Sequence, residues 1–193
     1  MNLPNKLTLS RIIMTILIII ILLFPFYQVG IEIPKYNVGG IIIGLEYVIA
    51  GLLFVIASVT DFLDGRIARS RHIVTDTGKM LDAIADKVLV NSVLIIFAAK
   101  GILHPIVPVI YIFRDEVVNA LRMHSASKGV VVPAGITGKI KTACMMVGLT
   151  LMFFSNLPFE LVNVRVDLFL IYCATILSVV SGVQYYNQIM KNK

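Results

Sequence analysis

Five of the eleven acidic residues lie in one 26-residue segment that runs from Asp61 to Asp86. Four of them form two pairs, because Asp61 and Asp64 are three residues apart and Asp82 and Asp86 are four apart. On a helix these spacings place both members of a pair on one face. Four neighbouring carboxylates repel one another unless cations lie between them, and such oxygen ligands suit Mg²⁺, Mn²⁺ or Ca²⁺ rather than zinc or copper. The segment therefore predicts a site for one or two divalent ions, Mg²⁺ or Mn²⁺ being our expectation.

Small residues and phosphate donors lie between the two pairs of aspartates. Gly65 and Ala68 remove side-chain bulk, which leaves room either for a flat ligand or for close helix packing. Arg69 and Thr75 can donate hydrogen bonds to phosphate oxygens beside the predicted metal ions. This combination favours phosphoryl-transfer chemistry on a lipid-linked substrate.

The composition places this chemistry at a membrane. Of the 193 residues, 58% are hydrophobic and 15% are charged, whereas a soluble domain has roughly 45–50% apolar and 25% charged residues. Asp residues at a membrane boundary could instead pair with Arg66, Arg69, Lys79 and Lys87 in a salt-bridge network. We favour a functional site, because four paired carboxylates at membrane depth are costly without a ligand.

Apolar stretches predict the helices that must position these residues, in a single all-α domain over residues 1–193. The expected membrane helices cover residues 12–27, 38–60, 80–99, 101–121, 136–157 and 164–186. With both termini in the cytoplasm, the opposite loops hold only Lys35, Lys100 and Arg165 of the 17 basic residues. The first stretch is expected to stay uncleaved, and the predicted location is the bacterial plasma membrane, with the active site at its cytoplasmic face.

The acidic segment resembles a complete family signature. It reads Asp61-Phe-Leu-Asp64-Gly65-Arg-Ile-Ala68-Arg69, followed at fixed spacing by Gly78, Asp82 and Asp86. This is similar to D-x2-D-G-x2-A-R-x8-G-x3-D-x3-D, the signature of CDP-alcohol phosphotransferases, at all eight specified positions. The resemblance implies a polytopic membrane enzyme that transfers a phosphatidyl group from CDP-diacylglycerol to an alcohol and releases CMP.

The same resemblance assigns roles to individual residues. Asp61, Asp64, Asp82 and Asp86 would bind the metal ions, and Asp86 would also take the proton from the attacking hydroxyl. The CDP-diacylglycerol site would include Gly65, Ala68, Arg69, Thr75 and Gly78. A homodimer is also implied by the resemblance.

The N-terminus resembles the phosphatidylglycerophosphate synthase branch of this family. It opens Asn2-Leu-Pro-Asn5-Lys-Leu-Thr8, and the resemblance would place Asn5 and Thr8 at the nucleotide end of the CDP-diacylglycerol site. Without it, the same residues read as a helix start in which Lys6 and Arg11 extend to the membrane surface.

The acceptor site is predicted from basic residues in the second half of the chain. Arg114 follows thirteen uncharged residues, so it needs an anionic ligand or a partner such as Asp115 or Glu116. The functional interpretation is a cationic pocket for the phosphate of sn-glycerol 3-phosphate, formed by Arg114, Arg122, Lys139 and Lys141. Lys139 and Lys141 point in different directions on a helix, so we expect only one of them to reach the ligand.

Two other functions stay open at this point. The same transfer could use inositol phosphate, phosphatidylglycerol or serine as acceptor. An ion transporter with a carboxylate relay would also explain aspartates at membrane depth, although it does not require the glycines and Arg69 at signature spacing. No nucleic-acid-binding motif is visible, and the net charge of +6 fits contact with anionic membrane lipids.

Overall fold

The computed structural model describes the backbone of residues 3–71, 76–127 and 135–191 and, among these, the side chains outside 3–6, 61–80, 82–83 and 191. This described part is mainly α-helical, with one small antiparallel sheet and two short 3-10 helices. In chain order the elements are α1 (Leu3–Leu23), η1 (Phe26–Val29), β1 (Lys35–Val38), β2 (Ile41–Gly44), α2 (Leu45–Arg71), α3 (Asp76–Ala99), α4 (Ile106–Ser127), α5 (Ile136–Phe153), η2 (Phe159–Val162) and α6 (Val166–Lys191).

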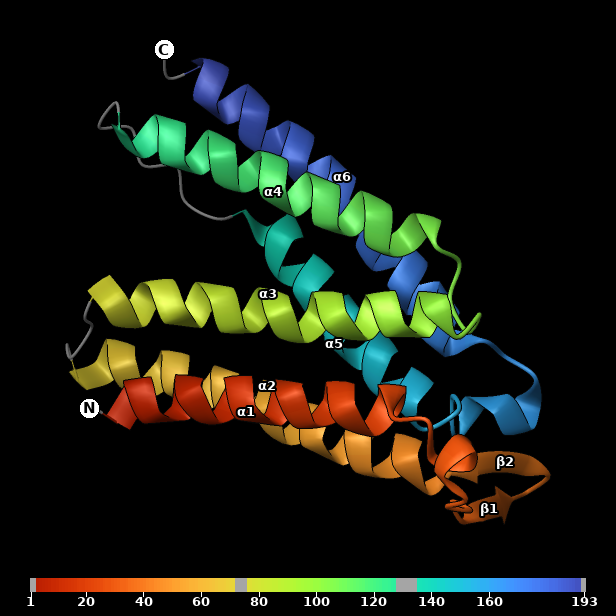
Figure 1. Cartoon of the computed structure of the whole chain (residues 1–193). Helices are drawn as coiled ribbons and strands as arrows, with labels where there is room; N and C mark the ends of the chain where they lie inside the picture. Colours follow the sequence, from red (N-terminus) through yellow and green to blue (C-terminus); the bar gives the residue numbers. More distant parts are fainter. Residues whose placement is uncertain (1–2, 72–75, 128–134, 192–193) are drawn as a thin grey trace.

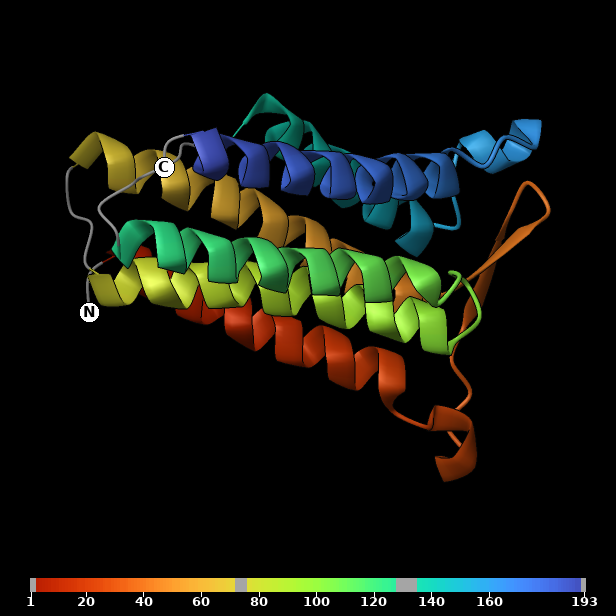
Figure 2. The ribbon, with the colours of Figure 1, turned by 90° about the horizontal axis from the view of Figure 1, so that it is seen from above.

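The helices form one bundle with two distinct ends. α1 packs against α2 and α3, while α6 packs against α4 and α5, and α5 also contacts α2. Figures 1 and 2 show that α1 begins and α6 ends at the same end of the bundle, where α2 also ends and α3 begins. The β-hairpin and η2 lie at the opposite end. The predicted aspartate pairs on α2 and α3 therefore belong to the end that carries both chain termini.

Three phenylalanines join α2, α3 and α5 at the centre of the core. Phe54 and Phe153 have ring centroids 5.4 Å apart, and Phe97 meets Phe153 edge-on at 4.9 Å. All three side chains are fully buried. Gly51 permits this contact, because a Cβ atom at that position would lie 2.8 Å from the Cβ of Phe153. The absence of a side chain at Gly51 thus sets how closely α2 approaches α5.

Large apolar side chains cover the outside of the helices as well as the core. α1 exposes Ile13, Ile16 and Ile20, which follow one helical face. α4 exposes Val109 and Phe113 in the same way, one turn apart. Such stripes would be unfavourable in water and are expected where a helix faces lipid.

Two helices of the described part have the length and hydropathy of membrane-spanning segments. The segments Ile136–Phe153 and Val166–Met190 are each long and apolar enough to cross a bilayer, and shorter apolar stretches cover Leu7–Leu23 and Leu45–Thr60. The helical fold and the membrane character predicted from composition agree with these segments.

The predicted start of the second helix is wrong. We expected helix from residue 38 onwards, but residues 35–44 form a hairpin in which Val38 pairs with Ile41. Gly39 and Gly40 have φ angles of 62° and 91°, which is the conformation a two-residue hairpin turn requires. The Asn37 side chain accepts a hydrogen bond from the Gly40 amide at 2.9 Å. Because these turn preferences dominate locally, α2 begins only at Leu45.

The first helix ends earlier than predicted, and the fourth helix begins later than predicted. α1 ends at Leu23, two residues before Pro25, which cannot continue the helical hydrogen bonding. Residues 101–105 lie outside α4, since Gly101 adopts a φ of 72° after α3 and Pro105 precedes the first turn of α4. α4 therefore starts at Ile106, five residues later than the apolar stretch indicated.

Candidate functional site

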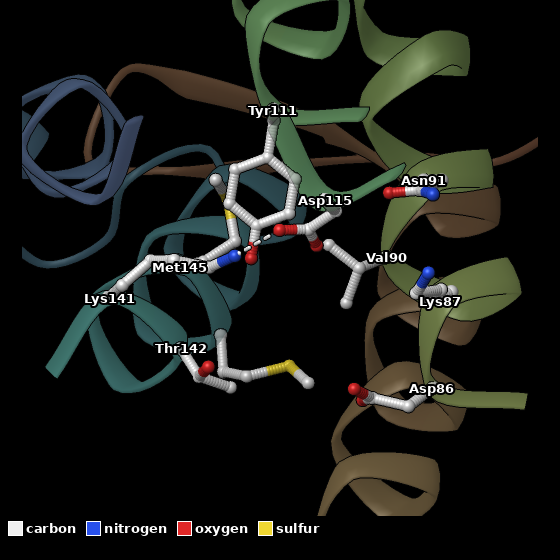
Figure 3. Close-up of a pocket in the computed structure, with 10 residues that line it drawn as sticks. Asp86, Lys87, Val90, Asn91, Tyr111, Asp115, Lys141, Thr142 and Met145 are labelled. Carbon is white, nitrogen blue, oxygen red and sulfur yellow. Dashed lines mark hydrogen bonds and ion pairs between the residues drawn. The ribbon is translucent and has the colours of Figure 1, made fainter. Parts of the chain in front are cut away.

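A polar pocket lies between α3, α4 and α5 and contains about 350 Å³ of space including its mouth. Figure 3 shows its walls, with Asp86 on one side and Lys141 on the other. Its lining residues come from α3 (Asp86, Lys87, Val90, Asn91), from α4 (Tyr111, Asp115) and from α5 (Lys141, Thr142, Met145, Met146).

Helical periodicity explains why these residues meet. Each wall consists of residues four apart, such as Asp86 and Val90 on α3 or Tyr111 and Asp115 on α4. Residues at this spacing stack on one helix face, so three helices each present one such face to the pocket. The pocket therefore follows from the register of the three helices rather than from a loop.

Lys141 is the buried cation of this pocket. Its residue is 5% exposed, and its ammonium donates a hydrogen bond to the Asp115 carboxylate at 2.6 Å. The ammonium also lies 4.1 Å from the centroid of the Tyr111 ring, close enough for a cation–π contact. An ammonium has three donors, and only one is used by Asp115 in these contacts. The remaining donors can bind an anionic ligand.

Arg114 lies against α6 and is bonded to Asp115. Its Nη1 donates to Asp115 at 2.8 Å and its Nη2 donates to the Ser181 hydroxyl of α6 at 2.6 Å. A Cβ atom at Gly182 would lie 3.2 Å from the Arg114 Nε, so the side chain lies against α6. Arg114 does not line the pocket. Arg114 is therefore paired with Asp115, which was the alternative to an anionic ligand.

The other two predicted acceptor residues also lie outside the pocket lining. Lys139 is exposed, although it is only two residues from the buried Lys141. Arg122 is exposed and lies over the Tyr185 ring, 5.6 Å from its centroid. The structure thus brings Lys141 together with Asp86 and leaves Lys139 and Arg122 elsewhere.

Of the predicted metal ligands, the Asp86 side chain is the one within the described part, and it lines the pocket. Asp61 and Asp64 are on the last turns of α2 and Asp82 is on α3, but their side chains lie outside the described part. Among the described side chains, no three His, Cys, Asp or Glu residues gather. The residue types fit a divalent ion, because carboxylate oxygens are the ligands that Mg²⁺ and Mn²⁺ prefer.

For most residues predicted to bind CDP-diacylglycerol, the structure describes only the helix to which they belong. Gly65, Ala68 and Arg69 are in α2, Gly78 is in α3 and Asn5 is in α1, whereas Thr75 lies outside the described residues. Thr8 is 2% exposed in α1. Arg11 is fully buried, so the interpretation in which it extends to the membrane surface is wrong. It lies one helical turn from the Thr15 hydroxyl, which donates to the Arg11 carbonyl oxygen at 2.8 Å.

Sequence reasoning did not single out Tyr111, Asn91 or Thr142 as pocket residues, and it treated Asp115 only as a partner of Arg114. A signal for Tyr111 was present, because it precedes Asp115 by four residues and so shares its helix face. Thr142 follows Lys141 directly, but an adjacent position does not predict a shared face. Its place in the pocket depends on how α5 is rotated against α3, which local sequence does not determine.

Comparison with known proteins gives consistent results over nearly the whole chain. Residues 1–180 match the family model described as CDP-alcohol phosphatidyltransferase. The chain is 37% identical over 187 residues to the CDP-diacylglycerol–glycerol-3-phosphate 3-phosphatidyltransferase of Bacillus subtilis, which covers 97% of this chain and 94% of that protein. A Rickettsia bellii protein with the same name is 34% identical over 191 residues, covering 98% and 96% of the two chains.

A solved structure has the same fold. The chain is similar to Mycobacterium tuberculosis phosphatidylinositol phosphate synthase in complex with manganese and citrate, with a TM-score of 0.62 and 18% sequence identity. The similarity covers 97% of this chain and 82% of that one. At this level of identity the likeness concerns the arrangement of the helices.

Proposed function

Because the chain belongs to the CDP-alcohol phosphatidyltransferase family, we propose that it transfers the phosphatidyl group of CDP-diacylglycerol to sn-glycerol 3-phosphate. The products are phosphatidylglycerol phosphate and CMP, and the process is phospholipid biosynthesis. Relatives that are similar over nearly their full length and are named for this reaction support the choice of acceptor. The observation that carries the proposal is the pocket in which the Asp86 carboxylate and the buried Lys141 ammonium occupy opposite walls (Figure 3).

The two walls match the two ends of the proposed acceptor. Lys141 offers an ammonium to the phosphate of sn-glycerol 3-phosphate, and a charge-assisted contact of this kind is stronger than a neutral hydrogen bond. Asp86 offers a carboxylate to the primary hydroxyl at the other end. The primary hydroxyl is the group that must lose a proton as it reacts.

The transfer breaks the phosphoanhydride bond of the diphosphate and forms a new phosphate ester bond. The primary hydroxyl oxygen attacks the phosphorus that carries diacylglycerol, and the bond from this phosphorus to the CMP oxygen breaks. CMP leaves with the bonding electron pair, and the proton of the hydroxyl passes to Asp86. General-base help of this kind contributes about 10²–10⁴-fold in rate.

Asp61, Asp64, Asp82 and Asp86 would hold one or two divalent ions near the diphosphate. When bound, Mg²⁺ or Mn²⁺ supplies positive charge that stabilises the diphosphate and the departing CMP. The manganese in the structure of similar fold supports the use of a divalent ion here. We assign the surrounding CDP-diacylglycerol site to Asn5, Thr8, Gly65, Ala68, Arg69, Thr75 and Gly78.

The remaining basic residues have indirect roles in this proposal. Arg114 supports Lys141 through their shared carboxylate, Asp115. Lys139 and Arg122 are exposed, so they contribute long-range electrostatic attraction for the anionic acceptor. This attraction weakens as the ionic strength rises. The phosphate contact itself is assigned to Lys141.

We place all six helices across the bacterial plasma membrane, with both termini and the active site on the cytoplasmic side. The apolar stripes on α1 and α4 and the span-length helices α5 and α6 support this arrangement. The excess of basic residues in the segments at that end supports the orientation. A homodimer is proposed from the family resemblance alone.

The function is tested by CMP release from purified protein in detergent with CDP-diacylglycerol. We expect release that needs both sn-glycerol 3-phosphate and Mg²⁺ or Mn²⁺, and that stops when a chelator removes the ion. Release that is unaffected by the chelator would contradict the metal assignment. An absence of release with every acceptor and ion would contradict the enzyme assignment and leave the carboxylate-relay transporter to be tested.

A further inference from the structure

Asp115 uses one of its two carboxylate oxygens for both of its cations. Its Oδ1 accepts a hydrogen bond from the Arg114 Nη1 at 2.8 Å and another from the Lys141 Nζ at 2.6 Å. Within the described part of the chain, Oδ2 accepts no hydrogen bond. The second oxygen therefore has its full capacity to accept a bond from a ligand.

The second oxygen belongs to the pocket rather than to the packed interior. Asp115 lines the pocket, and its side chain is 17% exposed. Oδ2 has no hydrogen-bond partner in the described residues and is not among the fully enclosed side-chain atoms, so part of its surface is accessible. Figure 3 shows the Asp115 carboxylate beside the Lys141 ammonium, on the far side of the pocket from Asp86.

We propose that Asp115 is a specificity-determining residue, whose Oδ2 accepts a hydrogen bond from the secondary hydroxyl of the acceptor. This inference rests on the proposed function and adds a recognition contact for the middle of the acceptor. In sn-glycerol 3-phosphate the secondary hydroxyl lies between the phosphate and the reacting primary hydroxyl. In the pocket, Asp115 adjoins Lys141, the proposed phosphate contact, and faces Asp86, the proposed base.

The two cations on Oδ1 make this contact selective. They hold the carboxylate in one orientation, so Oδ2 presents an acceptor in a fixed position. An acceptor molecule that lacks the secondary hydroxyl would leave this oxygen without a partner after water is displaced. Sites built to bind a hydroxyl reject the analogue that lacks it for this reason.

The test compares two acceptors that differ only at the middle carbon. Wild-type enzyme in detergent is assayed with sn-glycerol 3-phosphate and with 3-hydroxypropyl phosphate, which lacks the secondary hydroxyl. We expect kcat/KM to be about tenfold to a hundredfold higher for sn-glycerol 3-phosphate, the range for a hydrogen bond to a charged group. A wild-type preference below about threefold would overturn the proposal, because a hydrogen bond to a charged group contributes more than that.

The variant Asp115→Ala should lower this preference to near unity. The preference is a ratio measured on one preparation, so the fraction of folded enzyme cancels. If Asp115 only held Lys141 in place, its loss would reduce kcat/KM for both acceptors equally and leave the ratio unchanged. Asp115→Asn, which keeps the volume of the side chain, is measured as well and should also lower the ratio.

Glu116→Gln is the matched control, because Glu116 is the adjacent carboxylate on α4, is exposed, and bonds Lys87 rather than Lys141. Its ratio should equal that of the wild type. A preference that persists in both Asp115 variants would overturn the inference while the proposed function stands. If the wild-type enzyme were inactive with every acceptor, that result would instead contradict the proposed function.

Discussion

At the residue scale, the position of positive charge in the pocket depends on Asp115. Its carboxylate binds Lys141 from α5 and Arg114 from α4, and Arg114 is further held by Ser181 of α6. Arg114 is thereby directed toward α6, and Lys141 is left as the buried cation that lines the pocket. Because Arg114 and Lys141 share this oxygen, replacing either residue should shift the position of the other side chain.

The contrast between Lys141 and Lys139 tests this assignment. Lys141→Ala should raise the KM for sn-glycerol 3-phosphate by about tenfold to a hundredfold, because a charge-assisted contact to phosphate is lost. The KM for CDP-diacylglycerol should change much less. Lys139→Ala, two residues away on the same helix and exposed, should give a smaller rise. Steady-state kinetics with each substrate varied would decide, and a larger effect at Lys139 would contradict the pocket assignment.

Asp86 should act in turnover more than in binding. Asp86→Asn keeps an oxygen ligand but cannot take the proton, so kcat should fall by about 10²–10⁴-fold. Binding of CDP-diacylglycerol, measured by calorimetry or by displacement of a labelled nucleotide, should persist. Full activity in this variant would refute the assignment of Asp86 as the base.

Some of the site could be predicted from residue types and some could not. The spacing of the aspartates and the different directions of Lys139 and Lys141 are visible in the sequence, because helical periodicity links spacing to a face. Which of the two lysines is buried is not. The direction of Arg114 is not, since its partner Ser181 is 67 residues away and Gly182 makes room for it. Contacts of that kind depend on how α4 packs on α6.

At the scale of elements, hydropathy predicted where the helices lie but not every boundary. Apolar stretches contain each of the six described α-helices in large part, and Pro25 and Gly101 follow the ends of α1 and α3. The hairpin at residues 35–44 was missed, because three consecutive isoleucines after a Gly-Gly turn are as apolar as a helix. The Gly-Gly pair between β-branched residues was the signal that could have identified it.

Two glycines of α5 offer a matched test of helix packing. A Cβ atom at Gly148 would lie 2.8 Å from a side-chain carbon of Ile171 and 3.2 Å from the Asp167 carbonyl oxygen, whereas a Cβ at Gly138 would meet nothing within 4 Å. Gly148→Ala should therefore destabilise the protein by about 1–3 kcal/mol through overpacking. Gly138→Ala should be neutral or slightly stabilising.

The two alanine variants are compared by thermal unfolding in the same detergent. Because both gain a better helix former, the difference between their midpoints reports the crowding between α5 and α6. Equal midpoints would contradict the close approach of these helices at Gly148.

At the scale of the whole molecule, few charges and many apolar residues define a bundle that exposes hydrophobic side chains on its outer faces. The end that carries both termini also carries the acidic segment, and the hairpin marks the other end (Figures 1 and 2). The distribution of Lys and Arg predicts that the end with both termini is cytoplasmic, because basic residues are enriched in the cytoplasmic loops of membrane proteins. The angles at which the helices cross are set by side-chain packing, which composition does not describe.

Membrane orientation is tested by labelling single cysteines in intact cells. With Cys144 and Cys173 replaced by alanine, a cysteine at exposed Glu32 near the hairpin should react with a membrane-impermeant maleimide. A cysteine at exposed Gln188, near the end of α6, should react only after the cells are opened. The opposite pattern would place the active site outside the cytoplasm.

The most direct measurement of the central claim is a competition among acceptors in one reaction. Purified wild-type enzyme is given CDP-diacylglycerol, Mg²⁺ or Mn²⁺, and equal concentrations of sn-glycerol 3-phosphate, inositol phosphate, phosphatidylglycerol and serine. The lipid products are identified by mass spectrometry, and CMP is quantified alongside them. Phosphatidylglycerol phosphate should form in an amount equal to the CMP released. A different phospholipid as the main product, or no CMP at all, would contradict the account.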